Sequence, residues 1–220
     1  MDAHTLTSLL WEGTLQTLYM TLAATLVSYL IGLPVGVSLI VTGPNGIRPV
    51  SVYNKIMGFI VNVVRSVPFL ILMIACMPYI RKIIGTGIGT SATTAALIIA
   101  AWPFVARMVE QSLLEVDPGV IEAAQAMGAS NMQIVWKVLL PEARPSLMNG
   151  AAVATITILG YSAMAGTLGG GGLGDIAIRY GHYRFQPTIM WITIIVLVVL
   201  VQIMQEIGIK AAAKLDNRIS

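Results

Sequence analysis

Long apolar runs, separated by short polar segments, dominate the hydrophobic pattern of this chain. A helix needs about 20 mostly apolar residues to cross the hydrocarbon layer of a bilayer, which is about 30 Å thick. We predict five transmembrane helices, at about residues 15–41, 56–79, 88–106, 145–168 and 185–205. The pattern indicates an all-α polytopic membrane protein, and we expect residues 1–220 to form a single transmembrane domain.

The longest polar segment, residues 107–144, lies between the third and fourth predicted spans. Within it, Asp117 is a good N-cap and Pro118 suits the first helical position, so a helix is expected to begin there. That helix is expected to run to Gly128, which takes a left-handed conformation at little cost. A short capped helix is therefore expected within residues 107–144.

A second helix is expected directly after Gly128. Ser130 followed three residues later by Gln133 has the spacing of a capping box. Apolar residues then recur up to Leu139, and Pro141 is expected to end the helix. The two helices predict a helix-turn-helix bend, which we call the elbow (residues 117–141).

The residues of the elbow resemble the cytoplasmic loop motif of ABC-importer permeases. The matching residues are Glu122-Ala123-Ala124, then Gly128 after three residues, then Val138 and Leu140-Pro141. The family form has Ile at the position of Val138. The resemblance implies a coupling loop over residues 107–144 that contacts an ATPase. The ATPase-coupling residues it implies are Glu122, Ala123, Ala124, Met127, Gly128, Val138, Leu140 and Pro141.

Composition agrees with a membrane location. Apolar residues make up 56% of the chain and charged residues 10%, too few to cover a soluble globule of this size. The net charge of +3 comes from scattered Lys and Arg without interleaved aromatic residues, so no nucleic-acid binding is indicated. The single cysteine, Cys76, excludes an internal disulfide, and His4 and His182 lack partners at metal-ligand spacing, so no metal site is expected.

Basic residues predict the orientation of the five spans. One side of the membrane would carry Arg48, Lys55, Arg107, Lys137, Arg144, Lys210, Lys214 and Arg218, and the other side only Arg81, Lys82, Arg179 and Arg184. Arg65, which falls within a predicted span, is left uncounted. The more basic side is expected to be cytoplasmic. The N-terminus is then outside, the C-terminus is cytoplasmic, and the elbow lies in the cytoplasm.

The sequence offers no catalytic machinery. Gly169, Gly171 and Gly174 have the spacing of a dinucleotide-binding fingerprint, but they follow a membrane span and not a strand. No phosphate-loop motif and no nucleophile beside a plausible base is present, so the chain is not expected to be an enzyme. These glycines suit close helix packing or a bend. Asp175 and Arg179 are four residues apart, the spacing of an ion pair on a short helix. Alternatively, the loop that contains them is an ordinary solvent-exposed surface.

Two segments are candidates for the translocation path. The first is Arg65, Ser66 and Pro68, because a charge within a span needs water or a protein partner. Alternatively, Arg65 extends to the headgroups. The second contains Tyr161, Ser162 and Met164, where small neighbours would let the flexible Met164 side chain act as a gate. Alternatively, Met164 packs in the helix bundle and the gate lies at Tyr161 or Leu168.

Residues 160–185 and 65–69, taken with the elbow, resemble one branch of these permeases, that of the methionine-uptake ABC importers. The resemblance implies a homodimer in the bacterial inner membrane, two ATPase subunits that use ATP and Mg²⁺, an extracytoplasmic substrate-binding protein, and D- or L-methionine as cargo. The permease itself would bind no cofactor. A permease for another small solute is the nearest alternative. An ion-coupled secondary transporter would need an acidic group in mid-membrane, and no carboxylate lies in a predicted span before Glu206.

Overall fold

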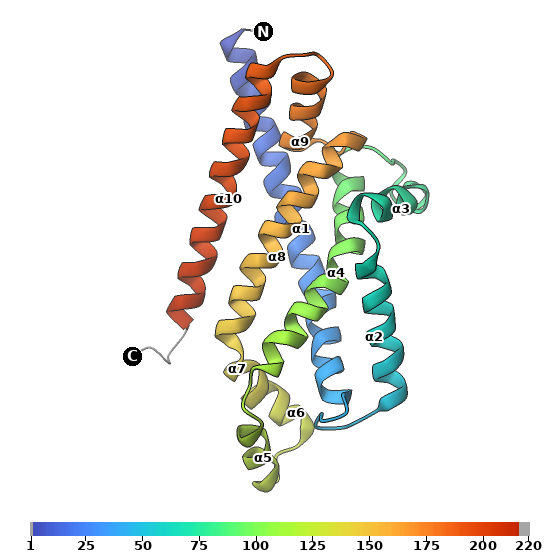
Figure 1. Cartoon of the computed structure of the whole chain (residues 1–220), viewed down its shortest axis with the longest axis vertical. Helices are drawn as coiled ribbons and strands as arrows, with labels where there is room; N and C mark the ends of the chain where they lie inside the picture. The colour runs from blue at the N-terminus through green and yellow to red at the C-terminus, as the bar shows by residue number, and fades with distance from the viewer. Residues whose placement is uncertain (1, 216–220) are drawn as a thin grey trace. The chain divides into compact units, whose positions relative to one another are not determined.

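The computed structural model describes residues 2–215, and every regular element in that range is helical (Figure 1). The longer helices are α1 (Ala3–Thr42), α2 (Ser51–Ser66), α3 (Phe69–Ile84), α4 (Thr90–Leu114), α8 (Arg144–Ala165) and α10 (Pro187–Leu215). The shorter helices are α5 (Pro118–Ala126), α6 (Asn131–Ile134), α7 (Leu140–Glu142) and α9 (Gly172–Ile176). The prediction of an all-helical chain is confirmed for the described residues.

Among the described residues, four helices are long and apolar enough to cross a membrane, or five if α2 and α3 are counted as one bent span. The chain leaves the helix at Val67 and Pro68, so the second span, predicted over residues 56–79, is not one straight helix. Proline has no N–H to donate and disfavours helical geometry in the residue before it. Pro68 therefore ends α2 and precedes the first residue of α3.

The helices divide into two compact units. The first unit contains the described residues up to 27, residues 67–101 and residues 155–205. Its main core contains Met20 and Ala24 of α1, Met73 and Ile80 of α3, Leu97 and Ala101 of α4, and Ile158 and Ala165 of α8. A second cluster joins Leu159 of α8, Leu173 of α9 and Leu200 of α10. Buried apolar side chains thus hold this unit together, and they come from α1, α3, α4, α8, α9 and α10.

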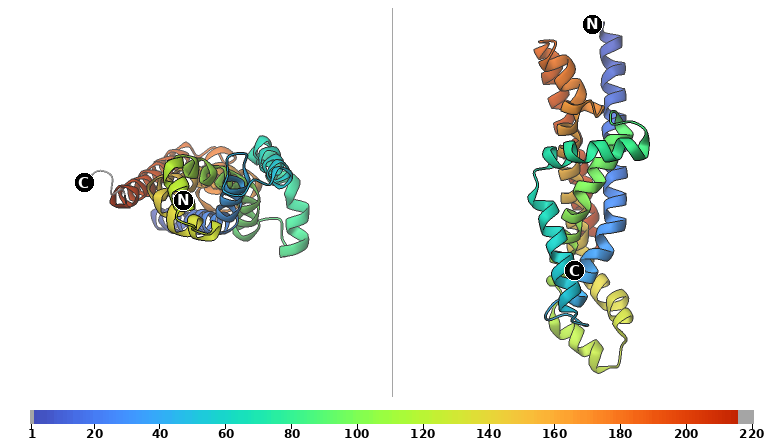
Figure 2. Two further views of the ribbon diagram at one scale, coloured as in Figure 1. Left: turned by 90° about the horizontal axis from the view of Figure 1, so that it is seen from below. Right: turned by 90° about the vertical axis from the view of Figure 1, so that its right-hand side faces the viewer.

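The second unit contains residues 28–66 and 102–154 and the described residues from 206 onward. Here the second half of α1 lies beside α2 (Figure 2). The Asn54 side chain donates to the Leu39 carbonyl over 2.7 Å, and the hydroxyls of Ser38 and Tyr53 are 2.8 Å apart. Leu39, Val61 and Ala106 form an apolar cluster, so α1, α2 and α4 pack together.

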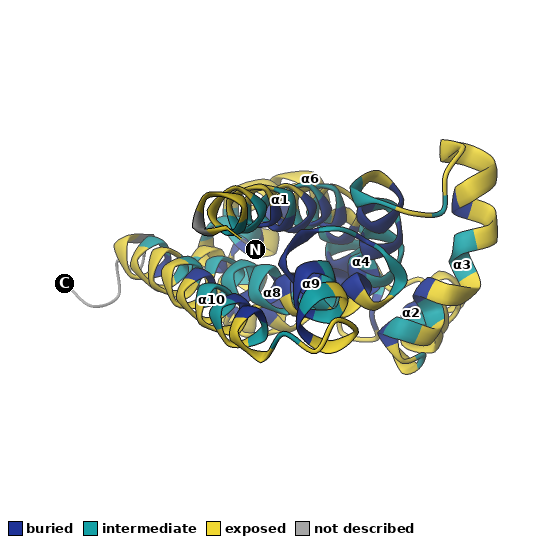
Figure 3. Ribbon diagram, turned by 90° about the horizontal axis from the view of Figure 1, so that it is seen from above, coloured by how far each residue is buried: buried dark blue, intermediate teal, exposed yellow. Residues whose placement is uncertain are grey.

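Large apolar side chains are exposed along α2, α3 and α10. Figure 3 colours many positions of these helices yellow, as exposed. They include Val52 and Phe59 of α2, Ile71 and Tyr79 of α3, and Trp191, Ile195 and Ile203 of α10. A water-exposed surface of this kind would be costly. Helix faces in contact with lipid or with other membrane helices are the natural explanation.

Arg218, one of the basic residues expected on the cytoplasmic side, lies outside the described residues.

Candidate functional site

The first arm of the elbow is α5, and its ends form as the sequence predicts. The Asp117 carboxylate accepts a hydrogen bond from the Gly119 N–H over 2.7 Å, and Pro118 occupies the first turn. At the other end Gly128 has a φ of +78°, the left-handed region that favours glycine. No atom lies within 4 Å of the position that a Cβ would take at Gly128. The backbone angle alone therefore selects glycine.

The second arm begins with the predicted capping box. The Ser130 N–H donates to the Gln133 side chain over 2.8 Å, and the Gln133 N–H donates to the Ser130 hydroxyl over 3.4 Å. Helix α6 then continues into a π-helical turn, Val135–Leu139, and into α7. The prediction that Pro141 ends this helix is wrong. The wider turn, in which the Leu140 N–H donates to the Val135 carbonyl, accommodates the proline within the helix.

The elbow has one exposed face and one buried face. Glu122, Ala123 and Met127 are exposed, with 82% of Met127 accessible, while Ala124 is buried. Ile121 and Leu140 pack on a cluster that includes Val109 and Leu113 of α4 and Leu139 of the π-helical turn. Val138 and Pro141 are partly buried. One face of the elbow is thus available to a partner, and the other is fixed to the base of α4.

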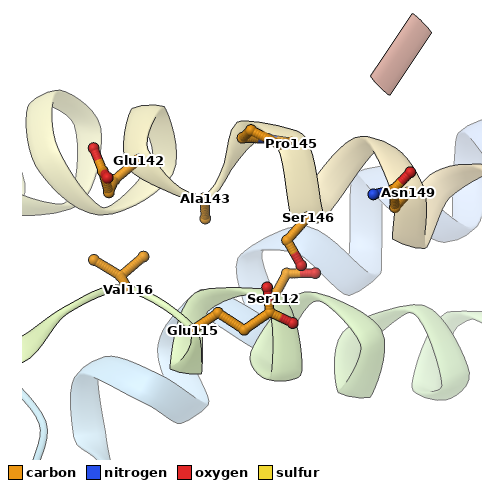
Figure 4. Close-up of a pocket in the computed structure, with 8 residues that line it drawn as sticks. All are labelled: Ser112, Glu115, Val116, Glu142, Ala143, Pro145, Ser146 and Asn149. Atoms are coloured by element: carbon orange, nitrogen blue, oxygen red, sulfur yellow. The ribbon is translucent and has the colours of Figure 1, made fainter. Parts of the chain in front are cut away.

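A cavity of about 340 Å³ lies between the end of α4 and the start of α8 (Figure 4). The hydroxyl of Ser146 points toward Ser112 and Glu115 of α4, whereas Glu142 of α7 points away from them. Sequence reasoning did not single out these residues, because Glu115 and Ser146 are far apart along the chain. No cluster of metal-ligating side chains exists in residues 2–215. The cavity is polar, and Val116 and Glu142, the residues on either side of the elbow in the sequence, both line it.

The glycine-rich segment (residues 166–174) connects α8 to α9 by tight backbone packing. Gly169, Gly171 and Gly172 have φ values between +75° and +78°. A Cβ on Gly174 would lie 2.2 Å from the Ala163 carbonyl oxygen, and one on Gly166 would lie 2.2 Å from the Asp175 nitrogen. The glycines therefore allow α9 to approach the end of α8 closely, as predicted for close packing.

Two side chains of α1 hold the start of α9. The Gly172 N–H donates to the Gln16 side-chain oxygen over 2.8 Å, and the Leu173 N–H donates to the Thr17 hydroxyl over 2.9 Å. These side chains satisfy N–H groups at the helix N-terminus that have no partner within the helix. No local pattern in the sequence points to this role, since Gln16 and Thr17 precede the segment by 156 residues.

The predicted path residues around Met164 do not share one environment. Met164 is 54% exposed, whereas Ser162 is buried and donates to the Leu159 carbonyl over 2.7 Å. The Tyr161 ring stacks on Phe69 of α3, with ring centres 4.4 Å apart, and Leu168 packs on the same core. Met164 alone of these residues is largely accessible, and the gate function stays a prediction.

The other predicted path segment lies at the break between α2 and α3. Arg65, Ser66 and Pro68 are all exposed. The Ser66 hydroxyl donates to the Asn62 carbonyl over 2.8 Å, and Arg65 has no ion-pair partner within residues 2–215. An exposed Arg65 is compatible both with a path and with the headgroups, and its role stays a prediction.

The predicted pairing of Asp175 with Arg179 is confirmed, with 2.9 Å between their charged atoms.

Comparisons with known proteins agree on one family. The profile described as "binding-protein-dependent transport system inner membrane component" matches residues 30–208. The chain is 50% identical over 210 residues to a probable D-methionine transport system permease protein of Vibrio cholerae, covering 96% of this chain and 93% of that protein. It is also 50% identical over 158 residues to the D-methionine transport system permease protein of Escherichia coli K12, covering 72% of this chain and 73% of that protein.

Solved structures show the same fold. A chain from inward-facing conformations of the MetNI methionine ABC transporter superposes with a TM-score of 0.96 at 44% identity. The match covers 99% of this chain and 100% of that chain. An amino acid ABC transporter crystallised with histidines is similar at a TM-score of 0.74 and 21% identity, which supports the fold alone.

Proposed function

Because the chain belongs to the family of binding-protein-dependent transport system inner membrane components, we propose that it is the permease subunit of an ATP-driven methionine importer. The observation that carries this proposal is the similarity to methionine permeases, 50% identity over 96% of the chain. The exposed face of the elbow supports the mechanism, and the identity to the relatives supports the cargo. A permease for another small solute is the alternative.

The elbow is the part of the chain that would receive force from the ATPase. Its exposed residues Glu122, Ala123 and Met127 would sit in a groove on the motor, while Ile121 and Leu140 transmit the displacement to α4 through apolar contacts. A capped helix with its own turn would move as a rigid body. The packed cluster then couples a shift of the elbow to the base of α4.

The complete importer would need partners that this chain does not supply. The sequence holds no phosphate loop, so ATP and Mg²⁺ would be used by two copies of a separate ATPase subunit. A second copy of the permease would provide the other half of the pathway, and an extracytoplasmic binding protein would deliver the amino acid. The permease would cross the bacterial inner membrane five times, with α2 and α3 as one broken span and the C-terminus in the cytoplasm.

Each candidate segment would contribute residues to the translocation path. Met164 is accessible, apolar and flexible, which suits a gate that closes against a second copy. Arg65 and Ser66 at the break between α2 and α3 would border the path, next to Pro68. Tyr161, stacked on Phe69, would position this region of α8, and Ser162 would stabilise the helix from within.

The experiment is substrate-stimulated ATP hydrolysis by the permease reconstituted with its ATPase and binding protein in liposomes. We expect D- or L-methionine to stimulate hydrolysis and to accumulate inside, while leucine, which is similar in size, does neither. Stimulation by a different solute would keep the mechanism and change the cargo. Uptake that follows an ion gradient without ATP would overturn the mechanism.

A further inference from the structure

A second groove, of about 360 Å³, lies in the second unit between α1, α2 and α4. Its polar lining comes from Asn54, Lys55 and Asn62 of α2 and from Arg107 and Glu110 of α4. Phe59 of α2 forms an apolar wall. We call this the basic groove. It involves none of the residues assigned to the elbow or to the translocation path.

The charges in the basic groove do not cancel. Arg107 pairs with Glu110 and donates a second hydrogen bond to the Asn62 side chain over 2.6 Å. The Asn54 amide is held by the Leu39 carbonyl and the Thr42 hydroxyl. Lys55 is exposed and has no ion-pair or hydrogen-bond partner within residues 2–215. The groove therefore carries one uncompensated positive charge beside fixed polar groups, which suits an anion.

The surface next to the groove is apolar and exposed. Phe59 is 68% accessible and Val52 is 71% accessible, and Ile56 lies exposed between them on α2. A ligand that fills both surfaces needs an anionic head and an apolar tail. A phospholipid has this chemistry, and basic pockets between membrane helices on the cytoplasmic side bind anionic headgroups. A free anion would leave the apolar face of α2 uncovered.

We propose that the basic groove binds the headgroup phosphate of an anionic phospholipid, with its acyl chains along the exposed face of α2. The proposal rests on the membrane placement and orientation proposed above, which put Lys55 and Arg107 on the cytoplasmic side. In this arrangement the Lys55 ammonium contacts the phosphate. Arg107, held by Glu110 and Asn62, donates from its remaining N–H groups.

The test counts lipids retained by the purified transporter, using native mass spectrometry after exposure to equimolar phosphatidylglycerol and phosphatidylcholine. We expect the unmodified protein to retain phosphatidylglycerol in preference. Lys55→Gln should lower that occupancy about fivefold, because one basic residue near the surface contributes about that factor. Lys55→Glu should lower it further. Lys137→Gln, which removes an exposed cytoplasmic charge of the elbow outside the groove, is the matched control.

Three results would overturn the proposal. They are unchanged phosphatidylglycerol retention in Lys55→Glu, an equal loss in Lys137→Gln, and displacement of the lipid by millimolar inorganic phosphate, which would assign the groove to a free anion. The first of these results is also the one expected if a second copy of the chain covers the groove in place of lipid. Because the readout is bound lipid, it does not depend on which solute the transporter carries, so failure here is distinct from failure of the methionine assay.

Discussion

The elbow and the glycine-rich segment are both turns between helices, yet they are held in opposite ways. In the elbow, Asp117 and Ser130 each bond to a backbone group within three residues. In the glycine-rich segment, the start of α9 is bonded to α1 across 156 residues of sequence. Contacts of the first kind join neighbouring residues of one segment, whereas contacts of the second kind need the folded unit. The caps of the elbow therefore do not depend on another part of the chain, whereas the start of α9 depends on the position of α1.

The largest expected effect tests the tight packing of the glycine-rich segment. Gly174→Ala would place a Cβ 2.2 Å from the Ala163 carbonyl oxygen and 2.6 Å from its Cα. Since both are backbone atoms, α8 and α9 must separate, and we expect the free energy of unfolding to fall by about 3 kcal/mol. Thermal unfolding of the purified protein in detergent measures this loss.

Gly160→Ala is the control for that substitution. Gly160 is exposed in α8, and nothing lies within 4 Å of the position that its Cβ would take, so alanine should be neutral or stabilise the helix by about 0.5–1 kcal/mol. Equal unfolding temperatures for the two variants would contradict the packing argument.

The turn of the elbow is tested by replacing Gly128, whose backbone is in the left-handed region. Gly128→Val forces a β-branched residue to a φ of +78°, which costs about 1–2 kcal/mol or more. We expect the turn angle to change, with uptake reduced roughly tenfold while the permease still inserts and assembles. Uptake and ATP hydrolysis are measured together in liposomes.

Ala213→Val provides the comparison, since it introduces a valine at an exposed position with helical backbone in α10, outside the elbow. That variant should transport normally. Unimpaired uptake in Gly128→Val would remove the elbow from the coupling mechanism.

The long-range cap of α9 is tested by Thr17→Val, which keeps the shape of the side chain and removes its hydroxyl. The buried Leu173 N–H then lacks an acceptor, and we expect a loss of about 1–3 kcal/mol in unfolding free energy. Thr17→Ser should restore most of the stability. If serine and valine have the same effect, the hydrogen bond to Leu173 is unimportant.

Ser130→Ala tests the local cap by the same logic. The loss should be about 1 kcal/mol and confined to the second arm of the elbow, so hydrogen exchange at residues 131–134 should accelerate about fivefold without a change in global unfolding temperature. Ser130→Asp keeps a capping oxygen and should behave as the unmodified protein. A global loss of stability would show that the elbow is not locally held.

The smallest effect on stability is expected at Met164. Because this side chain is 54% exposed, Met164→Ala should leave the unfolding temperature of the chain nearly unchanged. If Met164 is the gate, the variant should increase leakage of small solutes or basal ATP hydrolysis in proteoliposomes. A destabilised but tight transporter would assign Met164 to packing and move the gate to Tyr161 or Leu168.

Local and long-range contacts also differ in how far the sequence predicts them. The caps at Asp117 and Ser130 and the left-handed Gly128 follow rules that involve neighbouring residues only, so they were predicted correctly. Gln16 and Thr17 were missed because their roles depend on which segment packs beside them. The prediction of one span over residues 56–79 did not include the break at Pro68. The sequence did not show whether the helix would bend or end there, since tertiary packing decides this.

Position 141 was misjudged for a related reason. A proline normally ends a helix because it clashes with a carbonyl one turn earlier. The preceding π-helical turn, Val135–Leu139, widens the helix at that point, and no local pattern predicted it.

The π-helical turn has a consequence for chain length. A π-helical turn holds one more residue than an α-helical turn between the same two ends. Deleting one residue from Val135–Leu139 would therefore convert the turn to α-helical geometry. The Ser130 cap on one side of the turn and α8 on the other would keep nearly the same rotation relative to each other. The same deletion within α5 would rotate every later residue of that helix by about 100°, because an α-helix has 3.6 residues per turn. The connection from the elbow to α8 is thus a place where related chains can differ by one residue and keep both surfaces in register.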